Sequence, residues 1–307
     1  MEHERSGARL TRRALLRLMA AATAGPVPAG ASPPILERAI PSSGEKISAV
    51  GLGTWRTFDV GGGAGERAPL RDVLKAFVDL GGRVLDSSPM YGTAESVAGD
   101  LAADLEITER LFLATKVWTS GRQAGVAQME QSMKRLRTRR LDLMQIHNLL
   151  DWRTHLATLR EWKAAGRIRY LGVTHYTASA YDELERVLRS EPLDFVQVNY
   201  SLGERTAERR ILPLAQERGI AVLVNRPFAE GGLFGRVRGQ SLPAWAAEAD
   251  CESWAQIFLK WILAHPAVTC VIPATSRPQH LTDNMKAGTG RLPDAAMRER
   301  MGGVVSG

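Results

Sequence analysis

Cysteine is scarce in this chain of 307 residues, which contains only Cys251 and Cys270. Two cysteines are too few for the disulfide framework of a small secreted domain, and their spacing does not match that of metal ligands. We therefore expect two buried thiols, which behave as small hydrophobic side chains. A bridge between them stays open as an alternative if the protein works in an oxidising compartment.

Long apolar runs, histidine clusters and basic tracts are also missing. No apolar run reaches the roughly 20 residues of a membrane-spanning helix, so we expect no membrane span. The six histidines include no H-x-x-x-H pair, so we expect no metal site. Of the net charge of +7, five arginines and two glutamates place +3 in residues 1–31. The remaining +4 forms no basic run, which argues against nucleic acid as a partner.

Residues 1–31 resemble an export signal. Thr11-Arg12-Arg13-Ala14-Leu15-Leu16-Arg17 is similar to the twin-arginine motif, and a short apolar stretch follows it. Ala29-Gly30-Ala31 has the small-x-small pattern of a signal-peptidase site. The resemblance implies a signal peptide that directs the folded protein to the periplasm through the twin-arginine (Tat) export machinery. The alternative is a basic N-terminal tail, with which the protein stays in the cytoplasm.

Short runs rich in β-branched residues alternate with amphipathic segments from Lys46 onward. The runs are Ile47–Gly53, Arg83–Ser87, Leu111–Val117, Leu141–His147, Tyr170–Thr174, Phe195–Tyr200, Ala221–Arg226 and Thr269–Ala274. Between them, apolar residues recur three and four positions apart, as Leu70, Val73 and Phe77 do, which is typical of helices. Glycines such as Gly166 and Gly219 then follow the segments, as they do at helix ends.

Strands that alternate with helices form parallel βαβ units. Eight such units within roughly 250 residues predict a single-domain (β/α)8 barrel (TIM barrel), which we assign to residues 32–307. An open doubly wound sheet is the main alternative. However, Gly51-Leu52-Gly53-Thr54-Trp55-Arg56, at the end of the first run, lacks the third glycine of the dinucleotide-binding fingerprint. Glu230–Cys251, before the last run, predicts a long loop at the active-site end.

Four chemically active residues follow consecutive predicted strands. Asp86 ends the second strand, Tyr91 lies in the loop after it, Lys116 ends the third strand and His147 ends the fourth. The C-terminal strand ends of a (β/α)8 barrel form its active site, so these side chains should meet there. Taken singly, each residue also has a purely structural explanation. Asp86 and Lys116 could form an ion pair, Tyr91 could anchor its loop, and His147 could be a core histidine. Their shared register favours a catalytic site.

This combination suits the reduction of a carbonyl group, which needs a proton as it accepts hydride. A tyrosine with an ordinary pKa near 10 needs a nearby cation to stabilise its phenolate. Lys116 can provide that cation, Asp86 can keep it charged, and His147 can orient the carbonyl. A Schiff-base role for Lys116 is the weaker alternative, because a protonated amine is a poor nucleophile.

The same segments resemble the motifs of the aldo/keto reductases. The similarity runs from about Leu36 to the C-terminus and is carried by Val50–Trp55, Leu85–Gly92, Ala114–Lys116, Leu141–His147, Val196–Tyr200, Ile272–Pro278 and Asp283-Asn284. It implies that Asp86, Tyr91, Lys116 and His147 form a catalytic tetrad with Tyr91 as proton donor. It also implies hydride transfer from NADPH, or alternatively NADH, to an aldehyde or ketone.

The resemblance further implies where the cofactor and the substrate bind. Residues expected at the cofactor are Gly53, Thr54, Asp86, Thr174, His175, Gln197, Arg226, Phe228, Gly231, Thr275, Ser276, Arg277, Asp283 and Asn284. The substrate pocket is expected to include Trp55, Trp118 and Asn148. A small-molecule carbonyl compound is the expected substrate, and nothing in the sequence demands more than a monomer.

Several positions depart from the family pattern. His175 stands where an asparagine is usual, and Asn225 stands where a tyrosine often stacks on the nicotinamide. Ala274 and His280 replace a lysine and an arginine of many NADPH-dependent members, which leaves Arg277 as the expected 2′-phosphate partner. Arg226, in place of a small polar residue, is expected to bind the pyrophosphate or an anionic substrate. A cofactor-binding regulatory module with little turnover stays open as the alternative function, because fold alone does not establish catalysis.

Overall fold

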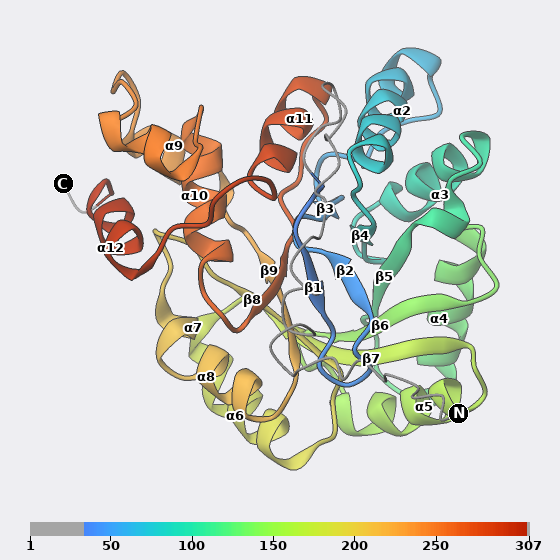
Figure 1. Ribbon diagram of the computed structural model, residues 1–307. Helices are drawn as coiled ribbons and strands as arrows, with labels where there is room; N and C mark the ends of the chain where they lie inside the picture. The colour runs from blue at the N-terminus through green and yellow to red at the C-terminus, as the bar shows by residue number, and fades with distance from the viewer. Residues whose placement is uncertain (1–33, 306–307) are drawn as a thin grey trace, which may run out of the picture. The chain divides into compact units, whose positions relative to one another are not determined.

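The computed structural model describes residues 34–305, which form the expected (β/α)8 barrel (Figure 1). The predicted signal peptide, residues 1–31, lies outside the described residues. Eight parallel strands follow one another around the sheet in sequence order, from β3 to β10. Parallel bridges from Val50 to Val271 and from Gly53 to Ala274 join the two ends of this sheet. The sheet is thereby closed into a barrel.

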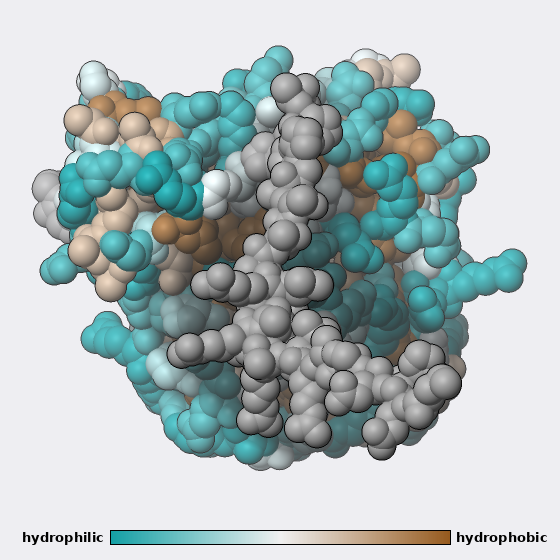
Figure 2. Space-filling model, in the orientation of Figure 1, coloured by the Kyte–Doolittle hydropathy of each residue, from teal (hydrophilic) through white to brown (hydrophobic). Residues whose placement is uncertain are grey.

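The strands of the barrel alternate with helices that surround it. The strands are β3 (Leu52–Gly53), β4 (Val84–Asp86), β5 (Phe112–Val117), β6 (Leu141–His147), β7 (Ile168–His175), β8 (Phe195–Asn199), β9 (Ala221–Asn225) and β10 (Val268–Val271). The helices are α2 (Ala64–Asp79), α3 (Ala94–Asp104), α4 (Arg122–Arg135), α5 (Trp152–Ala164), α6 (Tyr181–Ser190), α7 (Thr206–Arg209), α8 (Ile211–Glu217), α9 (Gly232–Arg236), α10 (Trp254–Leu263), α11 (Pro278–Lys286) and α12 (Ala295–Gly303). Hydrophilic side chains predominate on the face seen in Figure 2, with hydrophobic ones in smaller patches.

The segment predicted as the first strand, Ile47–Gly53, is divided between two elements. Lys46–Ser48 (β2) pairs antiparallel with Glu37–Ala39 (β1) in a hairpin, and only Leu52–Gly53 joins the barrel. The prediction of one continuous strand was therefore wrong. The physical reason is that Ile47 of the hairpin packs with side chains inside the barrel, such as Phe112 and Phe195, and so covers the N-terminal ends of the strands.

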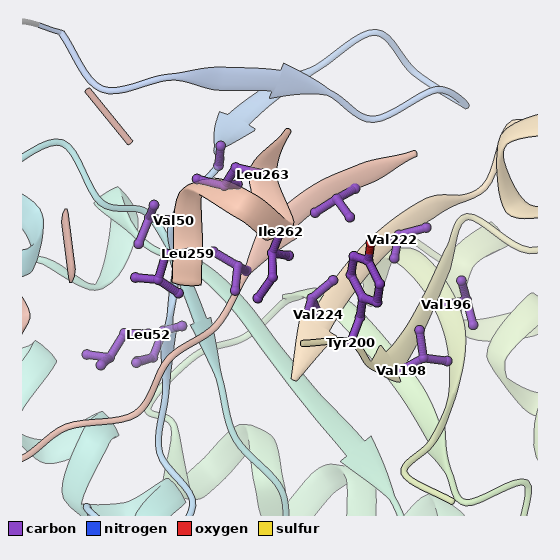
Figure 3. Packing of buried hydrophobic residues seen from close by; sticks show 14 of the residues in the cluster. Val50, Leu52, Val196, Val198, Tyr200, Val222, Val224, Leu259, Ile262 and Leu263 are labelled. Atoms are coloured by element: carbon purple, nitrogen blue, oxygen red, sulfur yellow. The ribbon is translucent and has the colours of Figure 1, made fainter. Parts of the chain in front are cut away.

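A second layer of core fills the space between the barrel and its helices. Along β8, Phe195 belongs to the interior cluster, whereas Val196 and Val198 belong to the outer one. Figure 3 shows these valines in one cluster with Tyr200, with Val222 and Val224 of β9 and with Ile262 of α10. Ile262 is fully buried, so its replacement by alanine should cost about 2–5 kcal/mol of unfolding free energy. This packing fixes the strand ends that carry the polar residues described below.

Both cysteines are free and buried, as expected for two buried thiols. Burial raises the pKa of Cys251 to about 11, so its thiol stays protonated at neutral pH. Within residues 34–305, no helix is long and apolar enough to cross a membrane. The same part of the chain holds no group of three His, Cys, Asp or Glu side chains arranged to bind a metal ion.

Candidate active site

Strand alternation brings the predicted catalytic residues into the barrel at one end. Val84 and Ala114 belong to the cluster inside the barrel, and Asp86 and Lys116 follow them by two residues. Successive side chains of a strand point to opposite faces, so residues two apart point the same way. Asp86, Lys116 and His147 stand at or near the C-terminal ends of their strands and therefore meet at one mouth.

A cavity of about 490 Å³ lies at this end of the barrel. Asp86, Tyr91 and His147 line it, while Lys116 is fully buried and is joined to the cavity wall through Asp86. The structure thus brings together the four residues that the sequence placed in one site. The cavity is large enough for a small organic molecule beside them.

The Asp86 carboxylate is held by donors from three other strands of the barrel, β5, β6 and β8. Lys116 Nζ donates to Oδ2 over 2.7 Å. The side-chain amides of Gln197 and Gln145 donate to Oδ1 over 2.9 and 3.2 Å. Lys116 Nζ also donates to the backbone oxygen of Ser87 over 2.7 Å. Because both carboxylate oxygens of Asp86 and the amine of Lys116 form hydrogen bonds, the two side chains are held in fixed positions inside the barrel.

Lys116 is a charged amine despite its burial. Burial acts to lower the pKa of Lys116, but the charges and hydrogen bonds of Asp86 and Tyr91 together outweigh it, and the pKa lies above its usual value. A protonated amine is a poor nucleophile. The geometry therefore favours Lys116 as a fixed cation and opposes the Schiff-base alternative.

Tyr91 lies between this cation and His147. Its ring centroid is 5.1 Å from Lys116 Nζ and 6.0 Å from the centroid of the His147 ring, which it meets edge to face. Burial raises the pKa of Tyr91 above its ordinary value, and the charge of Lys116 lowers it by a smaller amount. The expected cation is in place, and its charge acts as expected to stabilise the phenolate, but desolvation has the larger effect on the pKa.

His147 is a neutral imidazole. Burial, and then the charge of Lys116, lower the pKa of His147 to about 2. Ser88 Oγ lies 3.1 Å from its Nδ1, and both residues are buried. In the tautomer in which Ser88 donates to Nδ1, the ring hydrogen is on Nε2, and Nε2 can donate to a carbonyl oxygen.

Most of the residues expected at the cofactor border the same cavity. They are Gly53, Thr54, Thr174, Gln197, Arg226, Phe228 and Gly231, together with the expected pocket residues Trp55 and Asn148. Asn225 lines the cavity too. The Oδ1 atoms of Asn148 and Asn225 are buried without a hydrogen-bond partner among the described residues. Unpaired amide oxygens on a cavity wall fit a ligand rich in polar groups, such as a nicotinamide dinucleotide.

One residue expected at the cofactor, His175, and one expected in the substrate pocket, Trp118, lie outside the lining of this cavity. His175 accepts a hydrogen bond at Nδ1 from the backbone N–H of Thr177 over 3.0 Å, and its ring stacks on that of Tyr176. The Trp118 indole is 41% exposed, beyond the end of β5. Their expected roles at the cofactor and in the substrate pocket stay predictions.

The residues expected at the adenosine end do not line the cavity, and they lie just before α11 and within it. Ser276 and Arg277 are exposed, whereas Thr275 and Asn284 are buried. The Asp283 carboxylate accepts hydrogen bonds from Ser253 Oγ and Gln256 Nε2 over 2.7 and 2.6 Å. Asp283 therefore ties α11 to the start of α10, and the exposed Arg277 is the cationic member of this set.

The sequence did not single out Ser88, Gln145 or Tyr176 as site residues. Gln145 could have been found by alternation, since it lies two residues before His147 on the same strand. Tyr176 lines the cavity from the segment after β7. Ser88 contacts His147 across 59 residues of sequence, and no local pattern signals that contact.

Comparison with known proteins agrees with this geometry. The sequence model of the "Aldo/keto reductase family" matches residues 49–300. The chain is 31% identical over 256 residues to "Methylglyoxal reductase YeaE" of Escherichia coli, covering 81% of this chain and 88% of that protein.

Two solved structures from Klebsiella pneumoniae are also similar. An aldo/keto reductase in complex with NADP and acetate has 26% identity and a TM-score of 0.72, over 85% of this chain and 93% of its own. An aldo-keto reductase in complex with NADPH has 25% identity and a TM-score of 0.73, over 88% of this chain and 96% of its own. The protein described here belongs to the aldo/keto reductase family.

Proposed function

We propose that the protein reduces the carbonyl group of small aldehydes or ketones with NADPH, and that Tyr91 donates the proton. The observation that carries this proposal is the meeting of Tyr91, His147 and the Lys116–Asp86 ion pair at one cavity. A relative named as a methylglyoxal reductase and a similar structure that contains NADPH support it.

NADPH supplies the hydride when it is bound. Gly53, Thr54 and Gln197 are the residues that would hold its nicotinamide end, since they line the cavity beside Asp86. Arg277 would meet the 2′-phosphate, for which a guanidinium is a good partner. The unpaired amide oxygens of Asn148 and Asn225 are further acceptors for polar groups of the cofactor or the substrate.

The residues of the chain then perform three tasks. His147, neutral and with its hydrogen on Nε2, donates a hydrogen bond that orients the carbonyl oxygen. Tyr91, protonated at neutral pH, gives its hydroxyl proton to that oxygen as negative charge develops there. Lys116 stabilises the phenolate that remains, and Asp86 keeps Lys116 charged and in position.

The experiment is to follow the loss of NADPH absorbance in the presence of aldehydes, ketones and quinones. Turnover is expected with at least one class of carbonyl compound and with NADPH in preference to NADH. In Arg277→Gln the KM for NADPH should rise while the KM for NADH stays close to that of the wild type. Equal KM changes for both cofactors would show that Arg277 does not contact the 2′-phosphate.

A regulatory module with little turnover is not favoured by any observation of the site. Its four reactive side chains contact one another, and Asp86, Tyr91 and His147 line a cavity, which binding alone does not require. The relatives cited above are named as reductases.

We also propose that residues 1–31 act as a twin-arginine signal and that the protein works as a monomer in the periplasm. The support is the sequence pattern around Arg12 and Arg13. Replacement of both arginines by lysine should leave the full-length protein in the cytoplasm, as fractionation and immunoblotting would show. Unchanged export of the double variant would contradict the proposal, and light scattering of the mature protein would test the monomer.

A further inference from the structure

Arg226 enters the cavity between two aromatic rings. Its guanidinium carbon lies 4.6 Å from the centroid of the Tyr176 ring and 5.5 Å from that of Trp55, and all three residues line the cavity. Contacts of this kind orient a guanidinium while leaving its N–H groups free to bond in the plane. The side chain is therefore held in place without being buried.

The intramolecular partner of Arg226 is weakly held. Glu230 Oε1 lies 3.1 Å from a guanidinium nitrogen of Arg226, and the two side chains are 31% and 40% exposed. Exposed ion pairs contribute little free energy, since water screens both charges. An anion in the cavity can therefore replace Glu230 at a small cost.

Arg226 acts electrostatically on the reacting end of the cavity. Burial is the main influence on the pKa of Tyr91 and raises it, and Arg226, like Lys116, lowers it through its charge. An anionic group bound to Arg226 would thus lie in the same cavity as the Tyr91 hydroxyl.

The backbone around Arg226 is strained. Arg226, Ala229 and Glu230 have φ angles of 48°, 49° and 56°, in the left-handed region that residues other than glycine rarely adopt. Each such residue costs of order 1 kcal/mol, and strain of this kind persists where the surrounding structure fixes it. Here the strained residues include Arg226 itself, which lines the cavity.

We propose that Arg226 binds the carboxylate of the substrate and that the enzyme favours small carbonyl compounds that carry an anionic group. A planar guanidinium pairs with a carboxylate through two parallel N–H···O bonds. The proposal rests on the proposed reductase function and defines its substrate class. The dinucleotide pyrophosphate is the other anion that Arg226 could meet, and the experiment separates the two.

The test compares 3-carboxybenzaldehyde with its uncharged methyl ester at saturating NADPH. The wild type should have the higher kcat/KM for the acid. In Arg226→Gln, kcat/KM for the acid should fall about 10- to 100-fold, the range for a lost hydrogen-bonded charge, while the ester should change less than about twofold. Arg226→Lys keeps the charge but not the planar guanidinium. Its kcat/KM for the acid should therefore lie between that of the wild type and that of Arg226→Gln.

Two further variants act as matched controls. Arg56 also stacks on Trp55, at 4.2 Å from the ring centroid, but it is exposed and does not line the cavity. Arg56→Gln should therefore keep the acid-to-ester ratio of the wild type. Glu230→Gln removes the competing carboxylate and should lower the KM for the acid without changing that for the ester.

Calorimetric titration with benzoate tests the same site without turnover. Benzoate should bind the nucleotide-free wild type, bind Arg226→Gln at least about tenfold more weakly, and still bind the wild type saturated with NADP⁺. Equal losses for acid and ester, together with weaker NADPH binding by Arg226→Gln, would assign Arg226 to the pyrophosphate and overturn the proposal. Benzoate binding without any turnover would instead reject the reductase function while retaining the anion site.

Discussion

Ser88 Oγ and His147 Nδ1 lie 3.1 Å apart in the interior of the site. Ser88 is fully buried, and His147 is 6% exposed, so this contact is shielded from water. When Ser88 donates to Nδ1, the ring hydrogen of His147 is on Nε2. The contact is therefore a positioning device for the residue that orients the substrate.

Replacement of Ser88 by alanine should lower kcat/KM about fivefold, because one neutral hydrogen bond is worth about 1 kcal/mol. The loss should appear mainly in kcat, since without Ser88 the imidazole divides between two tautomers. Steady-state kinetics measures the effect, and ¹⁵N shifts of the His147 ring report the tautomer directly.

Ser132→Ala is the matched control for this variant. Ser132 is also fully buried, on α4, and its hydroxyl has no partner among the described residues. Its removal should leave kcat/KM unchanged. Equal activity of Ser88→Ala and wild type, with the same His147 tautomer in both, would contradict the assigned role.

Acid should destabilise the protein partly through His147. The unfolded chain protonates this residue near pH 6.5, whereas the folded protein keeps it neutral down to a pKa of about 2. Below pH 6.5 the unfolded state therefore binds one proton more than the folded state at this residue. As the pH decreases further, the unfolding free energy of the protein falls by up to about 1.4 kcal/mol per pH unit through this group. Above pH 6.5 the contribution is fully present.

Urea denaturation of wild type and His147→Gln between pH 7.5 and pH 4.5 checks this linkage. The two unfolding free energies should draw closer as the pH falls, since only the wild type loses the contribution. A constant difference across this range would mean that His147 titrates alike in both states.

The buried ion pair should matter far more for stability than a surface pair of similar length. Lys116 and Asp86 lie 2.7 Å apart and are almost fully buried, so Lys116→Met leaves an uncompensated carboxylate and should cost about 3–5 kcal/mol. Lys75 and Asp79 lie 2.6 Å apart with side chains more than half exposed, so Lys75→Met should cost less than about 1 kcal/mol. Urea denaturation of both variants gives the comparison, and similar losses would show that the Lys116–Asp86 pair is solvated.

The barrel and the meeting of Asp86, Lys116 and His147 could be predicted because both depend on local periodicity. Residues close together in the sequence are enough to recognise a strand, the spacing of a helix and the position of a residue in its strand. The division of Ile47–Gly53 could not be predicted in this way. Whether such a run bends into a hairpin depends on Ile47 finding partners inside a barrel built by later strands.

The finer properties of the site depend on distances that the sequence does not contain. The presence of Lys116 beside Tyr91 was predictable, but the balance between its charge and desolvation at the phenol was not. The exposed position of Trp118 likewise depends on how the segment after β5 leaves the barrel.

The most direct test of the mechanism is the rate of NADPH oxidation by wild type and Tyr91→Phe with the best carbonyl substrate. The phenylalanine keeps the ring in the cavity and removes only the hydroxyl, and a thermal melt verifies that the variant is folded. If Tyr91 is the proton donor, kcat should fall by about 100-fold or more, the usual contribution of a general acid. Turnover within a few fold of the wild type would show that the proton comes from another group.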